Sequence, residues 1–297
     1  MLFAELTKHY CEKMNIYGVF LLILHSINVY DIVKSTFLRK KQIMDKRPLI
    51  LISNDDGYSA KGINFLAEVA RQYGDVIVVA PDGPRSGASL AVTFHVPVTV
   101  SLIREEPGLK VYGCSGTPGD SIKMGMAQIC PRRPDLVLAG INHGDNSAVN
   151  VHYSGTKGVV IEGCLKEIPS VGFSHFSHGW DTDFEPMRPY IEKVLTHVLA
   201  HGLPKGVCLN VNAPDTTDYK GMRICKMGYG IWGEEWEERI SPRGWKYYWL
   251  VGKFDSHDQP DDVTDWNMMH QGYIAVTPTK IDITAYEAME KLRELER

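Results

Sequence analysis

Residues 49–57 read Leu-Ile-Leu-Ile-Ser-Asn-Asp-Asp-Gly. A continuous apolar run of this length is typical of a strand buried on both faces, the kind found in parallel sheets. The polar residues that follow are turn formers, so the strand ends there. This stretch therefore predicts a buried strand whose carboxyl end carries two adjacent carboxylates.

Outward from this strand, strand and helix patterns alternate. The segment after Gly57 places Ile63, Leu66, Ala67 and Ala70 on one stripe of a helix. Such alternation predicts an α/β fold with a mostly parallel sheet flanked by helices. Further strands are predicted at 75–80, 110–113, 135–139, 169–173 and 206–211, and helices after Thr117 (N-cap, with Pro118 first), from Ser154 to about Lys166, and over 188–201.

The pattern changes after about residue 222. Segments 224–229 and 246–251 flank a stretch rich in Trp, Gly and Glu, which predicts an extended antiparallel β arm over about 222–270. Residues 271–297 are expected to form a C-terminal strand and a charged closing helix. The arm's tryptophans, which suit packing or an oligomer contact better than base stacking, are Trp232, Trp236, Trp245 and Trp249.

Residues 1–47 differ from the rest of the chain. The apolar stretch at 16–27 is shorter than the roughly 20 residues that span a bilayer, and its basic run, at 39–41, comes after it rather than before. We expect residues 1–47 to be an extension outside the fold, with Met44 as a candidate start and a signal anchor as the alternative. The α/β domain is then predicted over 48–297.

Composition narrows the classes of function. The 297 residues include 36 acids and 32 bases, a net charge of −4. A nucleic-acid polymer is not an expected partner, because binding to its phosphates needs a basic excess. The six cysteines form no CxxC pair, which favours reduced thiols and a cytoplasmic location, and no membrane association is expected.

Oxygen-bearing side chains gather at the predicted carboxyl ends of the strands, where open parallel sheets bind ligands. Carboxylate, hydroxyl and amide oxygens together suit a hard cation such as Mg²⁺ or Mn²⁺. An Asp-Asp-Gly tripeptide alone is more often a simple turn, but its position after a buried strand favours a site. The side chains concerned are Asn54, Asp55 and Asp56, then Asp82, Arg85, Ser86 and Ser89, then Asn142 and Asn146.

Two helix starts are candidate phosphate sites. Residues 154–156, Ser-Gly-Thr, precede a helix whose free N–H groups and dipole favour an anion, and residues 113–120 offer a second start. Plain helix capping is the alternative for each taken singly. The pair His197 and His201 is interpreted as a helix face, and His175 and His178 as loop residues without a metal role.

These motifs together resemble the SurE family, the stationary-phase survival protein 5′-nucleotidases. The resemblance covers about residues 48–280 in order and spacing. Its motifs are Ile52 to Gly57, Ala80-Pro81-Asp82 with 85–89, Gly116-Thr117-Pro118 with Asp120, Gly140-Ile141-Asn142 with Gly144 and Asn146, Tyr153 to Thr156, and Glu162-Gly163.

The resemblance implies a Rossmann-like core and a divalent-metal phosphomonoesterase that hydrolyses nucleoside 5′-monophosphates, leaving 3′-monophosphates open. It implies one Mg²⁺ or Mn²⁺ per subunit and a homodimer or homotetramer formed through the arm and the C-terminal segment. The implied metal ligands are Asp55, Asp56, Ser86 and Asn142, with Asp55 and Asp56 catalytic, and the phosphate contacts are Asn54, Asn146, Ser154, Gly155 and Thr156.

The residues allow two chemistries: attack by a water that Asp55 or Asp56 positions, or attack by a carboxylate to give an aspartyl-phosphate. Two other functions stay open. One is hydrolysis of polyphosphate or another small phosphate ester, and the other is a nucleotide sensor without turnover.

Overall fold

The structure is a computed structural model that describes residues 47–296. Residues 1–46, which make up all but the last residue of the extension predicted at 1–47, lie outside the described residues. Pro48 to Arg297 form one compact unit, in which a single large sheet runs through the middle. Its strands are β1 (Leu49–Ser53), β2 (Asp75–Pro81), β3 (Val100–Glu106), β4 (Leu109–Cys114), β5 (Leu136–His143), β6 (Ser170–His175), β7 (Val207–Ala213), β8 (Met222–Ile224) and β13 (Ile274–Lys280).

The sheet has the order β3-β4-β2-β1-β5-β6-β7-β13-β8 and is mostly parallel, as the alternating pattern predicts. The five neighbouring pairs from β4 through β7 are all parallel. Antiparallel pairing occurs where β3 meets β4 and where β13 meets β7. Because β1 lies between β2 and β5, the loops that follow these three strands meet at one edge of the sheet.

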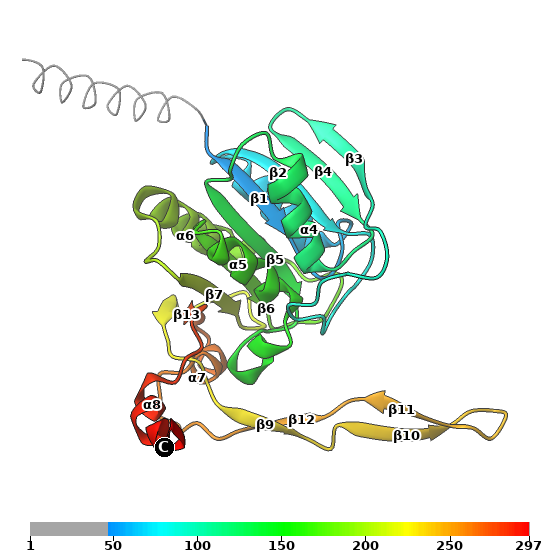
Figure 1. The fold of residues 1–297 in the computed structure, drawn as a ribbon, viewed down its shortest axis with the longest axis vertical. Helices are drawn as coiled ribbons and strands as arrows, with labels where there is room; N and C mark the ends of the chain where they lie inside the picture. Colours follow the sequence, from blue (N-terminus) through cyan, green and yellow to red (C-terminus); the bar gives the residue numbers. More distant parts are fainter. Residues whose placement is uncertain (1–46, 297) are drawn as a thin grey trace, which may run out of the picture. The chain divides into compact units, whose positions relative to one another are not determined.

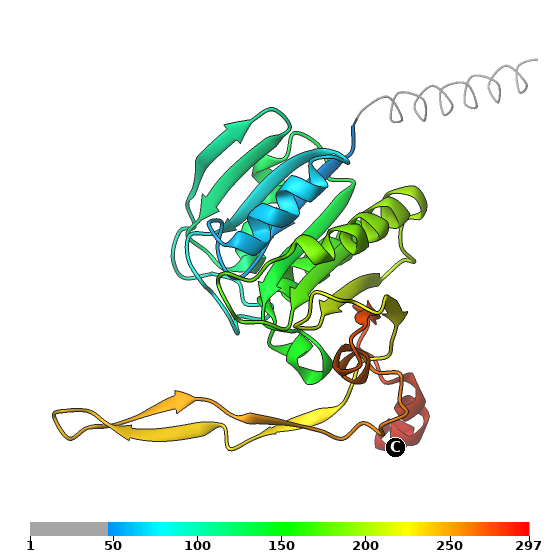
Figure 2. The same ribbon diagram turned by 180° about the vertical axis from the view of Figure 1, so that it is seen from behind.

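Helices cover both faces of this sheet, as Figures 1 and 2 show from opposite sides. One face carries α3 (Lys61–Ala70) and α6 (Arg188–His201), and the other carries α4 (Pro118–Met124) and α5 (Gly155–Leu165). The stripe predicted for α3 is buried as expected: Ile63, Leu66, Ala67 and Ala70 are at most 1% exposed.

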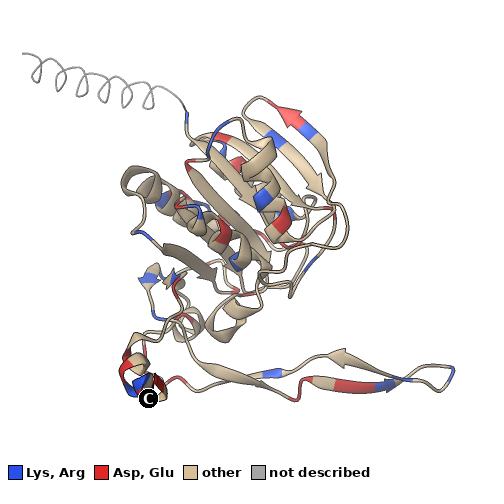
Figure 3. Cartoon of the chain, in the orientation of Figure 1, with Lys and Arg blue, Asp and Glu red and all other residues tan. Residues whose placement is uncertain are grey.

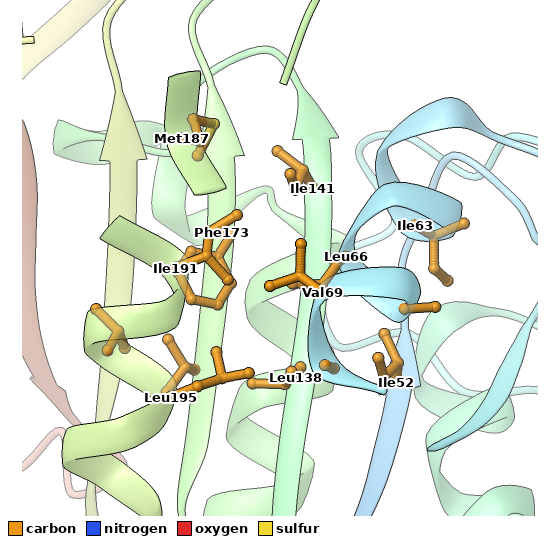
Figure 4. Close-up of a cluster of buried hydrophobic side chains, with 14 of the residues drawn as sticks. Ile52, Ile63, Leu66, Val69, Leu138, Ile141, Phe173, Met187, Ile191 and Leu195 are labelled. Atoms are coloured by element: carbon orange, nitrogen blue, oxygen red, sulfur yellow. The ribbon is translucent and has the colours of Figure 1, made fainter. Parts of the chain in front are cut away.

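Each face has its own apolar core. Figure 4 shows the core under α3 and α6, where side chains of both helices meet those of β1, β5 and β6. Ile52 points to this face, whereas Leu51 belongs to the core under α4 and α5, since successive strand residues face opposite ways. Strand β1 is therefore buried on both sides, which explains its continuous apolar run.

The predicted arm is a long two-stranded ribbon that leaves the sheet after β8 (Figure 1). It consists of β9 (Gly230–Gly233), β10 (Trp236–Ile240), β11 (Lys246–Leu250) and β12 (Lys253–Ser256), in two antiparallel pairs. The chain returns through α7 (Asp265–His270) to β13 and ends in α8 (Tyr286–Leu292). Acidic and basic residues are interspersed along the ribbon (Figure 3).

Several elements differ in extent from the sequence-based expectations. Strand β5 continues to His143 instead of stopping at residue 139, and it shifts register against β6 between Ala139 and Asn142. Strand β3 was not expected, because an exposed edge strand lacks the apolar run of a buried one. No helix among residues 47–296 combines the length and apolar character needed to cross a bilayer.

Candidate active site

Asp55 and Asp56 lie directly after β1 and are 3% and 7% exposed. The turn that presents them closes on Gly57, whose φ of +99° is a backbone conformation that favours glycine. Asn54 fixes this turn, because its Nδ2 donates to the Gly57 carbonyl and its Oδ1 accepts the Gly57 N–H, both at 3.1 Å. The structure thus gives the Asn54 side chain a role in shaping the turn.

Helix α5 brings the predicted Ser-Gly-Thr segment against Asp55. Thr156 Oγ1 donates to Asp55 Oδ1 at 2.6 Å, and the Gly155 backbone also hydrogen-bonds this carboxylate. A Cβ on Gly155 would lie 2.7 Å from the Asp55 Cβ, so only glycine permits this approach. Ser154 caps α5, its Oγ accepting the Lys157 N–H at 2.9 Å.

The end of β5 brings the predicted metal ligand Asn142 to the same place. The N–H of the next residue, His143, donates to Asp56 Oδ2 at 3.2 Å. Asn142 Nδ2 donates to the Gly144 carbonyl at 2.7 Å, which orients the amide. Strand ends that lie 87 residues apart in the sequence are therefore joined by a hydrogen bond.

The loop after β2 reaches the acidic pair through its backbone. The Arg85 N–H donates to the Asp55 carbonyl at 2.7 Å, which places the next residue, Ser86, at the edge of the site with its side chain exposed. The Arg85 guanidinium instead pairs with Asp82 at 3.1 Å. Ser89 Oγ donates to the His152 carbonyl at 2.8 Å and so ties this loop to the segment before α5.

Burial makes both carboxylates of the pair harder to ionise than an ordinary aspartate. Burial, and then the negative charge of Asp56, raise the pKa of Asp55 to about 6, although the Thr156 hydroxyl lowers it. Burial raises the pKa of Asp56 to about 6 as well. A bound cation would offset both the desolvation and the repulsion of two adjacent carboxylates.

The donor set fits a hard divalent cation. It offers two carboxylates, the Asn142 amide oxygen and the Ser86 hydroxyl, which are the ligand types that Mg²⁺ and Mn²⁺ prefer. Within residues 47–296, no cluster of three or more His, Cys, Asp or Glu side chains could hold a metal ion. A cation at this site therefore depends on the amide and hydroxyl oxygens in addition to the carboxylates.

A buried polar network behind the site supports Asn146 and was not expected from the sequence. Its N–H donates to Asn212 Oδ1, its carbonyl accepts from Asn210 Nδ2, and its own Nδ2 donates to Ser174 Oγ, each at 2.8 Å. Asn210, Asn212 and Ser174 are at most 2% exposed. These three residues lie near the ends of β6 and β7, which follow β5 in the same sheet. That position is the feature of the sequence from which the network could have been predicted.

The second candidate helix start, at 113–120, uses its polar groups internally. Thr117 and Asp120 form a capping box, and the Asp120 carboxylate occupies the start of α4, where an anion would have to bind. Ser115 Oγ accepts the Thr99 N–H. Helix capping, the alternative given above for this segment, therefore accounts for its polar residues.

The sequence analysis gave no role to His143 and Trp180, which lie near the site, and it expected His175 in a loop, whereas His175 ends β6 and is 3% exposed. The His143 ring lies 5.2 Å from the Trp180 ring, and a Cβ on Gly144 would meet the His178 ring at 2.5 Å. Residues 176–184 follow β6, so their position after a strand end was the signal. In contrast, His197 and His201 stack on each other on α6, as expected for a helix face.

Comparison with known proteins identifies the family of this chain. Residues 50–234 match the family described as Survival protein SurE. A protein of Phocaeicola vulgatus named 5′-nucleotidase SurE is 55% identical over 249 residues, which cover 84% of this chain and 96% of that protein. A Bacteroides thetaiotaomicron protein of the same name is 50% identical over 247 residues, with 83% and 95% coverage.

A solved structure agrees with the fold. The crystal structure of the SurE protein from Aquifex aeolicus superposes with a TM-score of 0.72 at 34% sequence identity. The match covers 84% of this chain and the whole of that chain. At this level of identity and overlap, the two chains share the same overall fold.

Proposed function

Because this chain belongs to the SurE family, we propose that it is a 5′-nucleotidase that hydrolyses nucleoside 5′-monophosphates to nucleoside and phosphate with one Mg²⁺ or Mn²⁺ per subunit. The observation that carries the proposal is the convergence of three separate strand ends and the α5 N-terminus on Asp55 and Asp56. The relatives named 5′-nucleotidase SurE support the same reaction class.

Asp55, Asp56, Asn142 and Ser86 are the residues that would hold the cation. A divalent ion there would polarise a phosphoryl oxygen and lower the pKa of a coordinated water. Asp56 fits the role of general base. The backbone N–H of His143 donates to its Oδ2, which leaves Oδ1 to take a proton from the attacking water. Attack by a carboxylate stays the second chemistry, and trapping of a phosphorylated Asp would establish it.

The phosphate end of the substrate is assigned to the start of α5. The Thr156 hydroxyl and the Gly155 backbone contact Asp55, and Ser154, whose hydroxyl caps the helix, is the residue before them. The positive end of the helix dipole stabilises the charge that accumulates on the phosphoryl oxygens. Asn146 borders this region and is held by its network to β6 and β7.

A panel of phosphate esters tests the proposal directly. Phosphate release is measured from nucleoside 5′- and 3′-monophosphates, ribose 5-phosphate and polyphosphate, with Mg²⁺ or Mn²⁺ and again with a chelator. We expect release from 5′-monophosphates that the chelator abolishes. Release only from polyphosphate would assign a different phosphohydrolase, and nucleotide binding without any release would assign a sensor.

Asp56→Asn is expected to lower kcat by about 100-fold or more, in the range that loss of a general base or a key charge produces. The free energy of unfolding should not fall, because the substitution removes one of two repelling buried carboxylates. Asp261→Asn, on the exposed turn after β12, is the matched control and should leave kcat unchanged. Near-normal turnover of Asp56→Asn with saturating cation would contradict the assignment.

We further propose that the arm joins copies of this chain into a homodimer or homotetramer. The ribbon exposes large apolar side chains along its length, among them Trp236 at 64% and Leu250 at 67%, which are cross-strand neighbours. A cytoplasmic location is the companion proposal, and it fits the five free cysteines of the described residues.

A further inference from the structure

The loop between β6 and α6, residues 176–184, is fastened over the end of β5. The Gly144 N–H points at the carbonyls of His175 and Ser177, at 2.9 and 3.1 Å. The His143 Nδ1 lies 3.0 Å from the Gly179 carbonyl. On the other side of the loop, Lys61 Nζ donates to the Asp181 carbonyl at 2.9 Å. The loop therefore has a defined position beside Asn142 and the acidic pair.

Trp180 lies in this loop with 63% of its surface exposed. Its ring centroid lies 5.2 Å from that of His143, with 36° between the planes, so the imidazole supports the indole. The His143 ring is itself fixed by the edge of Phe184 at 5.4 Å. A role in packing alone would bury the ring, as it does for Phe184, which is 1% exposed in the same segment. The fold instead holds a large aromatic surface open to solvent.

The position of this surface relative to the acids suggests its ligand. Asp55 is held by Thr156 on the side of α5, the phosphate end of the proposed site. Asp56 is held by the backbone of His143, whose ring leads to Trp180. The acidic pair thus lies between the start of α5, the proposed phosphate end, and an aromatic surface suited to a planar ring. A ligand with a phosphate at one end and a nucleobase at the other matches both.

We propose that Trp180, supported by His143, is the stacking surface for the nucleobase of the substrate. This inference rests on the proposed nucleotidase function and deepens it, since it names the group that distinguishes a nucleotide from a simple phosphate ester. Stacking on an indole face tolerates every base. The surface therefore selects for the presence of a base rather than for a particular one, and it acts on binding rather than on the chemical step.

Binding of two half-substrates tests the inference. Adenosine carries the base without a phosphate, and ribose 5-phosphate carries the phosphate without a base. Affinities are measured by equilibrium dialysis for the wild type, Trp180→Ala and Trp180→Phe. We expect Trp180→Ala to weaken adenosine binding by about 5- to 100-fold, with Trp180→Phe intermediate, and to leave ribose 5-phosphate binding unchanged.

Trp245→Ala is the matched control, because Trp245 is 66% exposed on the arm, away from the loop. Kinetics add a second readout: Trp180→Ala should raise KM for AMP by a similar factor and leave kcat within about 2-fold. The inference is overturned if adenosine does not bind the wild type, binds Trp180→Ala equally well, or loses affinity in step with ribose 5-phosphate. Absence of phosphate release from AMP by the wild type would instead overturn the proposed function. The adenosine measurement would still test whether Trp180 binds a nucleobase.

Discussion

At the scale of the residue, the buried acids set how the metal-free protein responds to pH. Burial holds the pKa of Asp55 and Asp56 at about 6 in the folded chain, against 3.8 for an ordinary aspartate. Between these values the folded chain binds more protons than the unfolded chain. The resulting stabilisation is present below pH 3.8 and is lost as the pH rises through 6.

Chelator-treated protein should therefore become less stable between pH 5 and pH 8 because of these two groups. Urea unfolding of the wild type and Asp56→Asn at both pH values isolates the effect, since the variant lacks one of the two titrations. We expect the stability of the variant relative to the wild type to rise by on the order of 1–2 kcal/mol over this interval. A difference that stays constant with pH would show that Asp56 ionises normally.

Asn212 is the residue through which β7 acts on the site. Asn212→Ala would leave the buried Asn146 N–H without its acceptor, which costs about 1–3 kcal/mol of unfolding free energy. We expect KM for a nucleotide to rise more than kcat falls, because Asn146 is proposed to border the phosphate. Denaturant unfolding and steady-state kinetics measure the two effects.

The control for Asn212 is Asn267→Ala, in α7. Asn267 Nδ2 donates to the carbonyls of Gln259 and Asp262, so this variant also loses hydrogen bonds, but none of them belongs to the site. It should lose stability while KM stays the same. An unchanged KM in Asn212→Ala would reduce the network to a purely structural role.

At the scale of the element, the fit of the start of α5 against the turn after β1 depends on the absence of a side chain at the first residue of the helix. Gly155→Ala would place a Cβ 2.7 Å from the Asp55 Cβ and 3.0 Å from its Oδ2, so the start of the helix has to move. Because Thr156 Oγ1 binds Asp55 from the next position, this movement disrupts the site. We expect kcat/KM to fall at least about 10-fold, the range in which small misplacements of catalytic groups act.

Gly233→Ala, on β9, is the control for this change, because no atom lies within 4 Å of a Cβ there. It should keep full activity. Activity is measured as phosphate release, and the melting temperature of both variants shows whether the fold is retained. Full activity of Gly155→Ala would mean that the helix start is not part of the catalytic geometry.

At the scale of the whole molecule, the outer pair of the arm, β10 and β11, exposes all of its residues to solvent. A two-stranded ribbon is marginally stable in water without further packing. The charge-bearing double variant Trp236→Glu/Leu250→Lys should therefore leave the sheet intact and reduce the oligomer to smaller species. Analytical ultracentrifugation measures the mass, and circular dichroism checks the fold.

The control for the arm is a pair of charge changes on an exposed surface of the main unit, Glu68→Lys with Lys193→Glu, on α3 and α6. This variant keeps the net charge and should sediment like the wild type. If the arm variant also keeps the wild-type mass, the ribbon is not the contact between copies.

The sequence by itself determined the fold class and most of the element order. Buried parallel strands can be recognised from apolar runs, and helix starts can be recognised from their capping residues, since both depend on local composition. Accordingly β1 and the starts of α4 and α5 were predicted closely, whereas the polar edge strand β3 was missed. The order and spacing of the motifs also determined the family, and residues 50–234 confirm it.

Only the tertiary structure decided which groups face one another. The contacts of Asp55 with Thr156 and of Asp56 with His143 span 101 and 87 residues, and they exist because β1 lies beside β5 and the start of α5 lies against the turn after β1. The roles of Asn212 in holding Asn146 and of His143 in supporting Trp180 have the same origin. Local sequence fixes where a strand ends, but the side chains that meet there are chosen by the packing of strands from distant parts of the chain.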